Sequence, residues 1–158
     1  MSTGAIIPRH GAGHSFVELL IMLALLGILA VIAVPTSDVG RAGVDALAHR
    51  LRSDLHYAQE MAMSTGTSHG FRAVTATSYE IFVGAPGTPA IDPYKQTAFV
   101  VNIPDYYRNV QFSGAQPTVT FISTGAPTIA GGPNIVLSDG TATRTLVVTP
   151  NTGVVVIQ

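Results

Sequence analysis

Residues 11–35 read GAGHSFVELLIMLALLGILAVIAVP and determine how the chain is organised. Glu18 is the only Asp, Glu, Lys or Arg between Arg9 and Asp38, and the 16 residues that follow it are all apolar or glycine. An ionised carboxylate in hydrocarbon costs at least ~2.5 kcal/mol. Anchoring alone does not account for Glu18, so the segment is expected to have a second role.

Two ordinary interpretations compete for this segment. A secretory signal cleaved near Ala33 would have an apolar core of about 16 residues, just beyond the usual ~7–15. Glu18 inside that core and Pro35 directly after the cut argue against it. A plain membrane anchor over Phe16–Val34 would have 19 residues, near the ~20 needed to span a bilayer, but it leaves the carboxylate unexplained.

The stretch GHSFVELL resembles the cleavage motif of type IV pilins and type II secretion pseudopilins. The resemblance implies that a prepilin peptidase cuts after Gly13, that the new N-terminus at His14 is methylated, and that Glu18 is the fifth mature residue. Pro35 falls at mature position 22, where that family often has proline, and would kink or locally open a helix. The family more often has Phe or Met where this chain has His14.

Cleavage at this point would create a free amine one helical turn before Glu18. The carboxylate could pair with the amine of its own chain or with that of the next subunit in a bundle. Because a buried carboxylate without a partner is penalised, this pairing would fix the axial register between subunits. We therefore predict that Glu18 acts in filament assembly.

The sequence divides into four stretches: a leader over 1–13, a transmembrane or filament-core helix over 14–35, an amphipathic helix over 36–66 and a β-rich head over 67–158. In the third stretch apolar residues recur every three or four positions and define one helix face, comprising Val44, Leu47, Leu51, Leu55, Ala58 and Ala62. Gly66 is a natural helix end. The pattern predicts one long helix, interrupted at Pro35.

Residues rich in Val, Ile, Thr, Tyr and Phe follow Gly66 and are separated by turn signals. The predicted strands are His69–Val74, Tyr79–Val83, Ala98–Ile103, Thr118–Ile122, Ile135–Leu137, Thr145–Thr149 and Val154–Ile157. Hairpin turns are expected at Asp139-Gly140 and Pro150–Gly153, and a long surface loop at Gly84–Pro93. A helix followed by short consecutive strands predicts an α+β, pilin-like fold with the helix packed on an antiparallel sheet.

The stretches LRSDLHYAQEMAMSTG, VTFISTG and TLVVTPNTGVVVIQ resemble the GspH/FimT family of minor pseudopilins and minor pilins. This resemblance implies a structural subunit of a type II secretion pseudopilus, which serves protein export across the outer membrane. The alternative it implies is a FimT-like type IV minor pilin acting in pilus biogenesis or DNA uptake. The implied partners are major and tip pseudopilins, the prepilin peptidase and methyltransferase, and an inner-membrane assembly platform. The implied location is the bacterial inner membrane, with one pass and the head in the periplasm.

The sequence predicts no enzymatic role and no cofactor. Gly66–Gly70 matches G-x-S-x-G, but a nucleophile elbow needs a strand before it and a helix after it, whereas the reverse order is predicted here. His49 and His56 share a helix face without completing a metal-ligand set, so no metal site is predicted. The loop acids Asp92, Asp105 and Asp139 leave a calcium site open.

Charge and composition disfavour nucleic acid as a partner. The net charge is −1, and the last basic residue, Arg144, stands alone in the sequence. Phosphate binding gains from clustered cations, but the other arginines are scattered and offset by acids such as Asp45, Asp54 and Glu60. The chain has no cysteine, so an exported head must be held by its core without disulfides.

Overall fold

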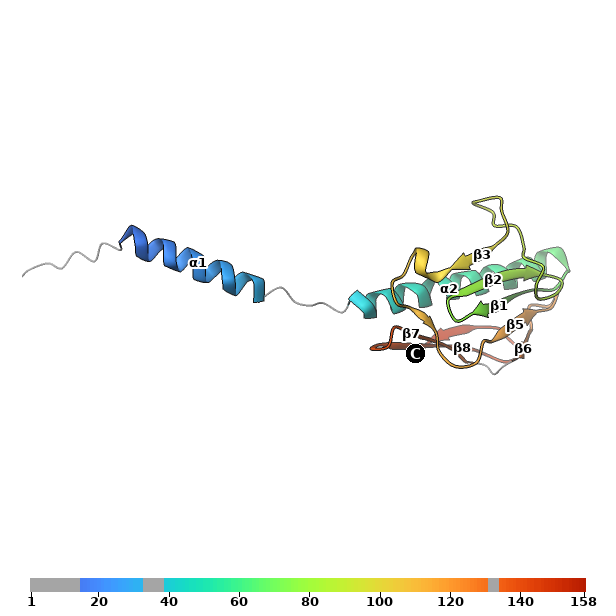
Figure 1. Ribbon diagram of the computed structural model, residues 1–158. Helices are drawn as coiled ribbons and strands as arrows, with labels where there is room; N and C mark the ends of the chain where they lie inside the picture. The colour runs from blue at the N-terminus through green and yellow to red at the C-terminus, as the bar shows by residue number, and fades with distance from the viewer. Residues whose placement is uncertain (1–14, 33–38, 131–133) are drawn as a thin grey trace, which may run out of the picture. The chain divides into compact units, whose positions relative to one another are not determined.

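The computed structural model of the protein describes residues 15–32, 39–130 and 134–158 (Figure 1). The chain forms two compact units, residues 1–37 and 38–158, which we describe separately. The predicted cleavage residues Gly13 and His14 lie outside the described residues, as does Pro35.

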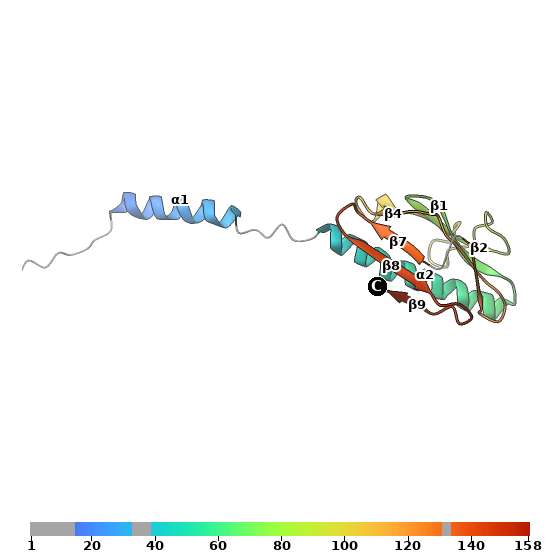
Figure 2. The same ribbon diagram turned by 90° about the horizontal axis from the view of Figure 1, so that it is seen from below.

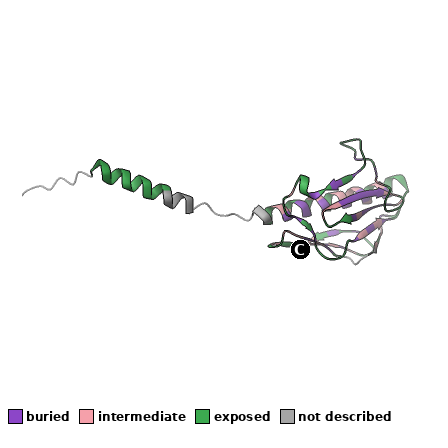
Figure 3. Ribbon diagram, in the orientation of Figure 1, coloured by how far each residue is buried: buried purple, intermediate pink, exposed green. Residues whose placement is uncertain are grey.

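The first unit contains helix α1, Phe16–Ile32. Its first turn carries Glu18, and the backbone N–H of Leu19 bonds to the carbonyl of Ser15 at 3.1 Å. The described side chains of this helix are exposed (Figure 3). In the described part of the chain, no helix combines the length and the apolar character needed to span a membrane.

The second unit begins with helix α2, Val39–Thr65. The six residues predicted to form its apolar face are each fully buried, together with Ala48. The helix ends as expected, because Gly66 has φ +69° and its N–H bonds to the carbonyl of Ala62 at 3.1 Å. The periodicity of apolar residues therefore predicted both the face and the end of α2 correctly.

Five strands form the first antiparallel sheet, in the order β3-β2-β1-β5-β6. Their bounds are β1 His69–Thr75, β2 Ser78–Val83, β3 Val100–Asn102, β5 Thr118–Phe121 and β6 Pro127–Ala130. A short 3-10 helix, η1, Ile103–Asp105, follows β3.

Four strands form the second antiparallel sheet, in the order β4-β7-β8-β9. Their bounds are β4 Gln111–Phe112, β7 Asn134–Ser138, β8 Thr143–Val148 and β9 Val155–Ile157. Figure 2 shows β7, β8 and β9 running beside α2, which contacts strands of both sheets.

The core of the head lies where α2 meets the two sheets. Phe71 of β1, Tyr79 of β2 and Phe112 of β4 form an aromatic group with ring centroids 5.5–6.2 Å apart. Because Phe112 belongs to the second sheet, this group joins the two sheets as well as filling the core. The architecture confirms the predicted α+β fold, with the amphipathic helix packed on antiparallel sheet structure.

The seven predicted strands are confirmed, but the described head has two further strands that were not predicted. Each of the seven predicted strands is present within a few residues of its expected bounds, but β4 and β6 were missed. β4 is only two residues long, and β6 begins at Pro127 inside a stretch that reads as a turn. The head consequently has two sheets over the described residues, where a single sheet was expected.

Candidate functional site

The exposed surface of α1 is the first candidate for an assembly surface. Nine large apolar side chains between Phe16 and Leu26 are each 51–77% exposed, and they surround the helix on all sides. A helix that is apolar all round requires apolar surroundings, either lipid or other helices. The described part of α1 therefore has the chemistry of a segment suited to apolar surroundings.

Glu18 is exposed in the first turn of α1. A carboxylate at this end of a helix interacts favourably with the helix dipole and with the unpaired backbone N–H groups of the first turn. The described structure thus places Glu18 at the helix end nearest the predicted cleavage point. Its predicted pairing partner, the amine of His14, lies outside the described residues.

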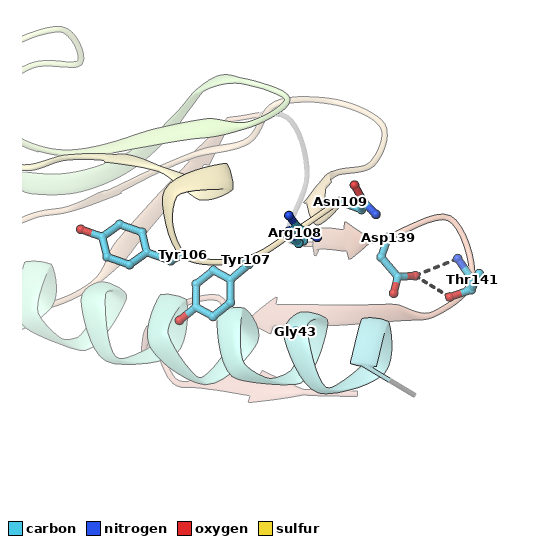
Figure 4. A pocket seen from close by; sticks show the side chains of 7 residues that line it. All are labelled: Gly43, Tyr106, Tyr107, Arg108, Asn109, Asp139 and Thr141. Atoms are coloured by element: carbon cyan, nitrogen blue, oxygen red, sulfur yellow. Dashed lines mark hydrogen bonds between the residues drawn. The ribbon is translucent and has the colours of Figure 1, made fainter. Parts of the chain in front are cut away.

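A hollow of about 590 Å³ opens on the head beside the first turns of α2 (Figure 4). Its lining comes from α2, from the segment after η1 and from the β7–β8 turn, and comprises Gly43, Tyr106, Tyr107, Arg108, Asn109, Asp139 and Thr141. Asp139 accepts hydrogen bonds from the backbone N–H and the hydroxyl of Thr141, at 2.8 and 2.9 Å. The N–H of Ala142 also donates to Asp139, and this bond, followed by those from Thr141, lowers the pKa of Asp139; all three bonds are accepted by Oδ1.

The other two loop acids are also engaged locally. Asp92 accepts the N–H groups of Tyr94 and Lys95, and Asp105 accepts the side-chain amide of Asn102. In the described residues no group of three or more His, Asp or Glu side chains could hold a metal ion. The described structure does not bring Asp92, Asp105 and Asp139 together as a calcium site.

A polar network ties the middle of α2 to the first sheet. The Tyr79 hydroxyl donates to Asp54 Oδ2 at 2.6 Å, and Arg50 Nε lies 3.9 Å from the same oxygen. Burial is the main reason that the pKa of Asp54 is raised, although the Tyr79 hydrogen bond and Arg50 act in the opposite sense. Burial also raises the pKa of Tyr79, so this hydroxyl stays protonated and remains a donor.

Arg144 is paired in the structure. Its Nε and Nη2 atoms face the two carboxylate oxygens of Asp45 in α2, and the Nη2–Oδ2 distance is 3.4 Å. This ion pair joins residues 99 positions apart. The last basic residue of the chain is thus occupied by a carboxylate, which reduces its availability for a phosphate.

A second ion pair, between β1 and β2, was not predicted. Arg72 Nε lies 2.9 Å from Glu80 Oε1, near enough for an ion pair but not aligned as a hydrogen bond. Glu80 is 4% exposed and accepts the N–H of Gly87 at 2.7 Å. The register of the β1–β2 hairpin, which pairs Arg72 with Glu80, is the signal that could have revealed it.

The remaining predicted site residues lie where the sequence placed them. Gly66–Gly70 runs from the end of α2 into β1, so the order around it is helix then strand, opposite to that of a nucleophile elbow. His49 is exposed and His56 is half-buried on α2.

The architecture of a helix packed on antiparallel sheets is shared with a known protein. A solved structure with this fold is the type IV minor pilin FimU of Pseudomonas aeruginosa strain PAO1, with a TM-score of 0.51 and 13% sequence identity. The match covers 72% of this chain and 91% of that one, so the protein has the fold of a minor pilin. No curated protein sequence matches the chain.

The family model of the type II transport protein GspH matches residues 47–153, from α2 to the turn before β9. The match covers more than half of the chain, which therefore belongs to the GspH family. The family and the fold confirm the resemblance predicted from sequence. They identify the protein as a minor pseudopilin or a type IV minor pilin. Both families consist of structural subunits and not of enzymes. The matched region starts after α1, so the predicted roles of Gly13, His14, Glu18 and Pro35 stay predictions.

Proposed function

We propose that this protein is a minor pseudopilin, a structural subunit of a type II secretion pseudopilus that serves protein export across the outer membrane. The observation that carries the proposal is α1, an all-round apolar helix with a single carboxylate in its first turn, preceding a head that matches the GspH family. The protein does no chemistry of its own, and its function is to assemble.

In this proposal a prepilin peptidase cuts between Gly13 and His14, and the new amine is methylated. The segment 14–35 holds the chain in the inner membrane with the head in the periplasm, and Pro35 allows the helix to bend. On assembly, an apolar helix exchanges lipid contact for contact with the helices of major and tip subunits. Pairing of Glu18 with the amine of a neighbouring subunit sets the axial register, because an unpaired carboxylate in that bundle is penalised.

The first test is the intact mass and the N-terminal peptide of the protein isolated from its native membrane. A chain that begins at methylated His14 supports processing by the pilin route. A chain that begins at Met1, or near Val34, contradicts the proposal and leaves an anchored or secreted domain.

The second test compares Glu18→Ala with the control Leu20→Ala. The control also introduces alanine into α1 but leaves the carboxylate of Glu18 in place. We expect Glu18→Ala to abolish secretion or filament assembly and Leu20→Ala to leave it within a few-fold of wild type. Equal activity of the two variants would show that Glu18 has no role in register.

A type IV minor pilin acting in pilus biogenesis or DNA uptake is the second candidate, and the shared fold with FimU supports it. The pairing of Arg144 with Asp45 speaks against the DNA-uptake version. Retardation of duplex DNA by the purified chain at moderate salt would favour DNA uptake, whereas absence of a shift would eliminate it.

A further inference from the structure

A second hollow, of about 440 Å³, lies between α2 and the loop that joins β2 to β3. We call it the α2 groove; its principal lining residues are Ser53, His56, Tyr57, Glu60, Tyr94 and Phe99. The loop stands out from the body of the head (Figure 1). Neither the ion pair of Arg144 nor the predicted N-terminal site involves this groove.

Aromatic rings form the apolar walls of the α2 groove. The rings of Tyr57 and Phe99 have centroids 5.8 Å apart and an interplanar angle of 44°. Tyr94 is 95% exposed, so nearly its whole ring is available to another molecule. An exposed aromatic side chain at the rim of a hollow is typical of protein recognition surfaces.

Carboxylates supply the charge of the α2 groove. Asp54 and Glu60 line it, and the buried Asp92 lies close enough to contribute to the raised pKa of Asp54 and of Tyr57, for both of which burial is the main cause. None of the described lining residues is Lys or Arg. Glu60 makes no ion pair or side-chain hydrogen bond with the described part of the chain, so its charge is available to a partner.

Two basic side chains, Arg50 and Lys95, lie against Tyr106, which is not part of the groove lining. Arg50 Cζ lies 4.5 Å from the centroid of that ring, and Lys95 Nζ donates to its hydroxyl at 2.6 Å. Arg50 reaches Asp54 at only 3.9 Å, from the side of the Tyr79 network. Among the lining residues of the groove, Glu60 is therefore the carboxylate left available beside the aromatic faces, since Asp54 is engaged by Tyr79 and Arg50.

The exposed position of Tyr94 is built into the loop. Asp92, 7% exposed, accepts the N–H groups of Tyr94 and Lys95 at 2.8 and 3.2 Å, and its own N–H bonds to the carbonyl of Thr97. The other limb of the loop is fixed by Glu80, which accepts the N–H of Gly87. Because these hydrogen bonds already hold the backbone of the turn, binding of a partner to Tyr94 costs little further backbone entropy in this loop.

We propose that the α2 groove binds an arginine or lysine side chain from a different subunit of the same filament. Guanidinium and ammonium groups are attracted both to carboxylates and to the faces of aromatic rings, and their alkyl stems pack on apolar walls. The occupant is assigned by charge complementarity: the groove offers carboxylates and rings, and lacks the three-carboxylate geometry of a metal site in the described residues. This inference rests on the proposed function, since it requires a neighbouring subunit.

The experiment places the photo-reactive residue p-benzoylphenylalanine at position 94 of the full chain in its native cells. After irradiation, the joined peptide is sequenced by mass spectrometry. We expect an adduct with another filament subunit, at a segment that holds Arg or Lys within a few residues of the joined position. An adduct with a second copy of this chain, an adduct at a segment without a basic residue, or no adduct in cells that form the filament would overturn the proposal.

Charge is tested with Glu60→Gln in the photo-reactive chain, and Asp105→Asn is the matched control because it removes an exposed carboxylate elsewhere on the head. We expect Glu60→Gln to reduce the adduct yield about threefold, as for loss of one exposed ion pair, and Asp105→Asn to leave it unchanged. Equal yields in the two variants would contradict a cationic occupant.

The Glu18→Ala strain separates this proposal from the proposed function. If Glu18→Ala leaves secretion and assembly intact, the assembly role itself fails, whatever the adducts show. The other case is that Glu18→Ala abolishes assembly, while cells that keep Glu18 form the filament but give no adduct at position 94. In that case only the assignment of the α2 groove fails.

Discussion

Asp54 shows how a residue that looks like surface charge in the sequence becomes part of the interior. It lies on the flank of α2, where the Tyr79 hydroxyl reaches it from the first sheet. Burial raises its pKa in the folded protein above the value in the unfolded chain. The folded state then holds a proton over a pH range in which the unfolded state has released it, so the contribution of Asp54 to stability falls as the pH rises through that range.

Asp54→Asn should remove this pH dependence while keeping an oxygen that accepts the Tyr79 hydrogen bond. We expect the free energy of unfolding of wild type, relative to Asp54→Asn, to fall as the pH rises above about 4, where a free Asp ionises. Urea unfolding of both chains at several pH values between 4 and 7 measures the difference. A difference that is constant over this range would show that Asp54 titrates normally.

Gln59 fastens two loops to α2. Its side-chain amide donates to the carbonyls of Gly125 and Thr152, each at 2.8 Å. Gly125 follows β5 in the first sheet, and Thr152 lies in the turn between β8 and β9 in the second.

Gln59→Ala should lower the free energy of unfolding by about 1–2 kcal/mol, because it removes two hydrogen bonds and leaves two carbonyls to find other partners. Gln111→Ala, at an exposed position on β4, is the control and should change stability by less than about 0.5 kcal/mol. Chemical unfolding monitored by circular dichroism compares them. Equal stability of both variants would mean that water replaces the Gln59 bonds without loss.

Among the elements, the two turns predicted from sequence differ in what surrounds their glycines. Gly140, in the β7–β8 turn, has φ +91° and open space where a Cβ would stand. Gly153, before β9, has φ +71°, and a Cβ there would lie 2.6 Å from Gln59 Nε2 and 2.9 Å from the Phe121 ring. The first turn requires glycine only for its backbone, and the second also requires it for close packing.

Gly140→Ala should cost about 1 kcal/mol, as for an L-residue placed in the left-handed region. Gly153→Ala should cost a further ~1–3 kcal/mol, because the added methyl group displaces packed neighbours. The urea midpoints of the two variants measure this difference. If they coincide, the packing at Gly153 is looser than the structure indicates.

The sequence predicted those elements whose side chains alternate or recur, and missed those set by distant contacts. The buried face of α2 follows from its period, and the glycine turns follow from backbone preference. β4 has only two residues and exists because Phe112 packs on Phe71 and Tyr79, a contact that no local pattern encodes. The α2 groove was likewise not predicted, because Tyr57 and Tyr94 line the same hollow only once the loop lies beside α2.

For the whole molecule, the division into two units places the described hydrophobic core in the second unit. The buried core of the head, over the described residues, consists of side chains between Val44 and Val155, and Ile157 packs against it. All of these residues belong to the second unit. The lack of cysteine leaves this core as the main source of stability in the head.

We therefore expect Glu18→Ala to leave the free energy of unfolding of the head unchanged within about 0.5 kcal/mol, whatever its effect on the proposed assembly. Leu51→Ala, in the buried face of α2, should lower stability by about 2–5 kcal/mol and serves as the positive control. Both are measured on the full chain in detergent. Destabilisation of the head by Glu18→Ala would mean that its effect on assembly is an indirect effect of misfolding.

The attachment made by Gln59 also has a mechanical consequence. A pulling force along α2 would be transmitted through the Gln59 side chain to one loop of each sheet. Gln59 lies near the C-terminal end of α2. Because the same side chain is bonded to a loop of each sheet, we expect such a force to act on both sheets at once. We therefore expect the two sheets of the head to resist a force applied through α2 together.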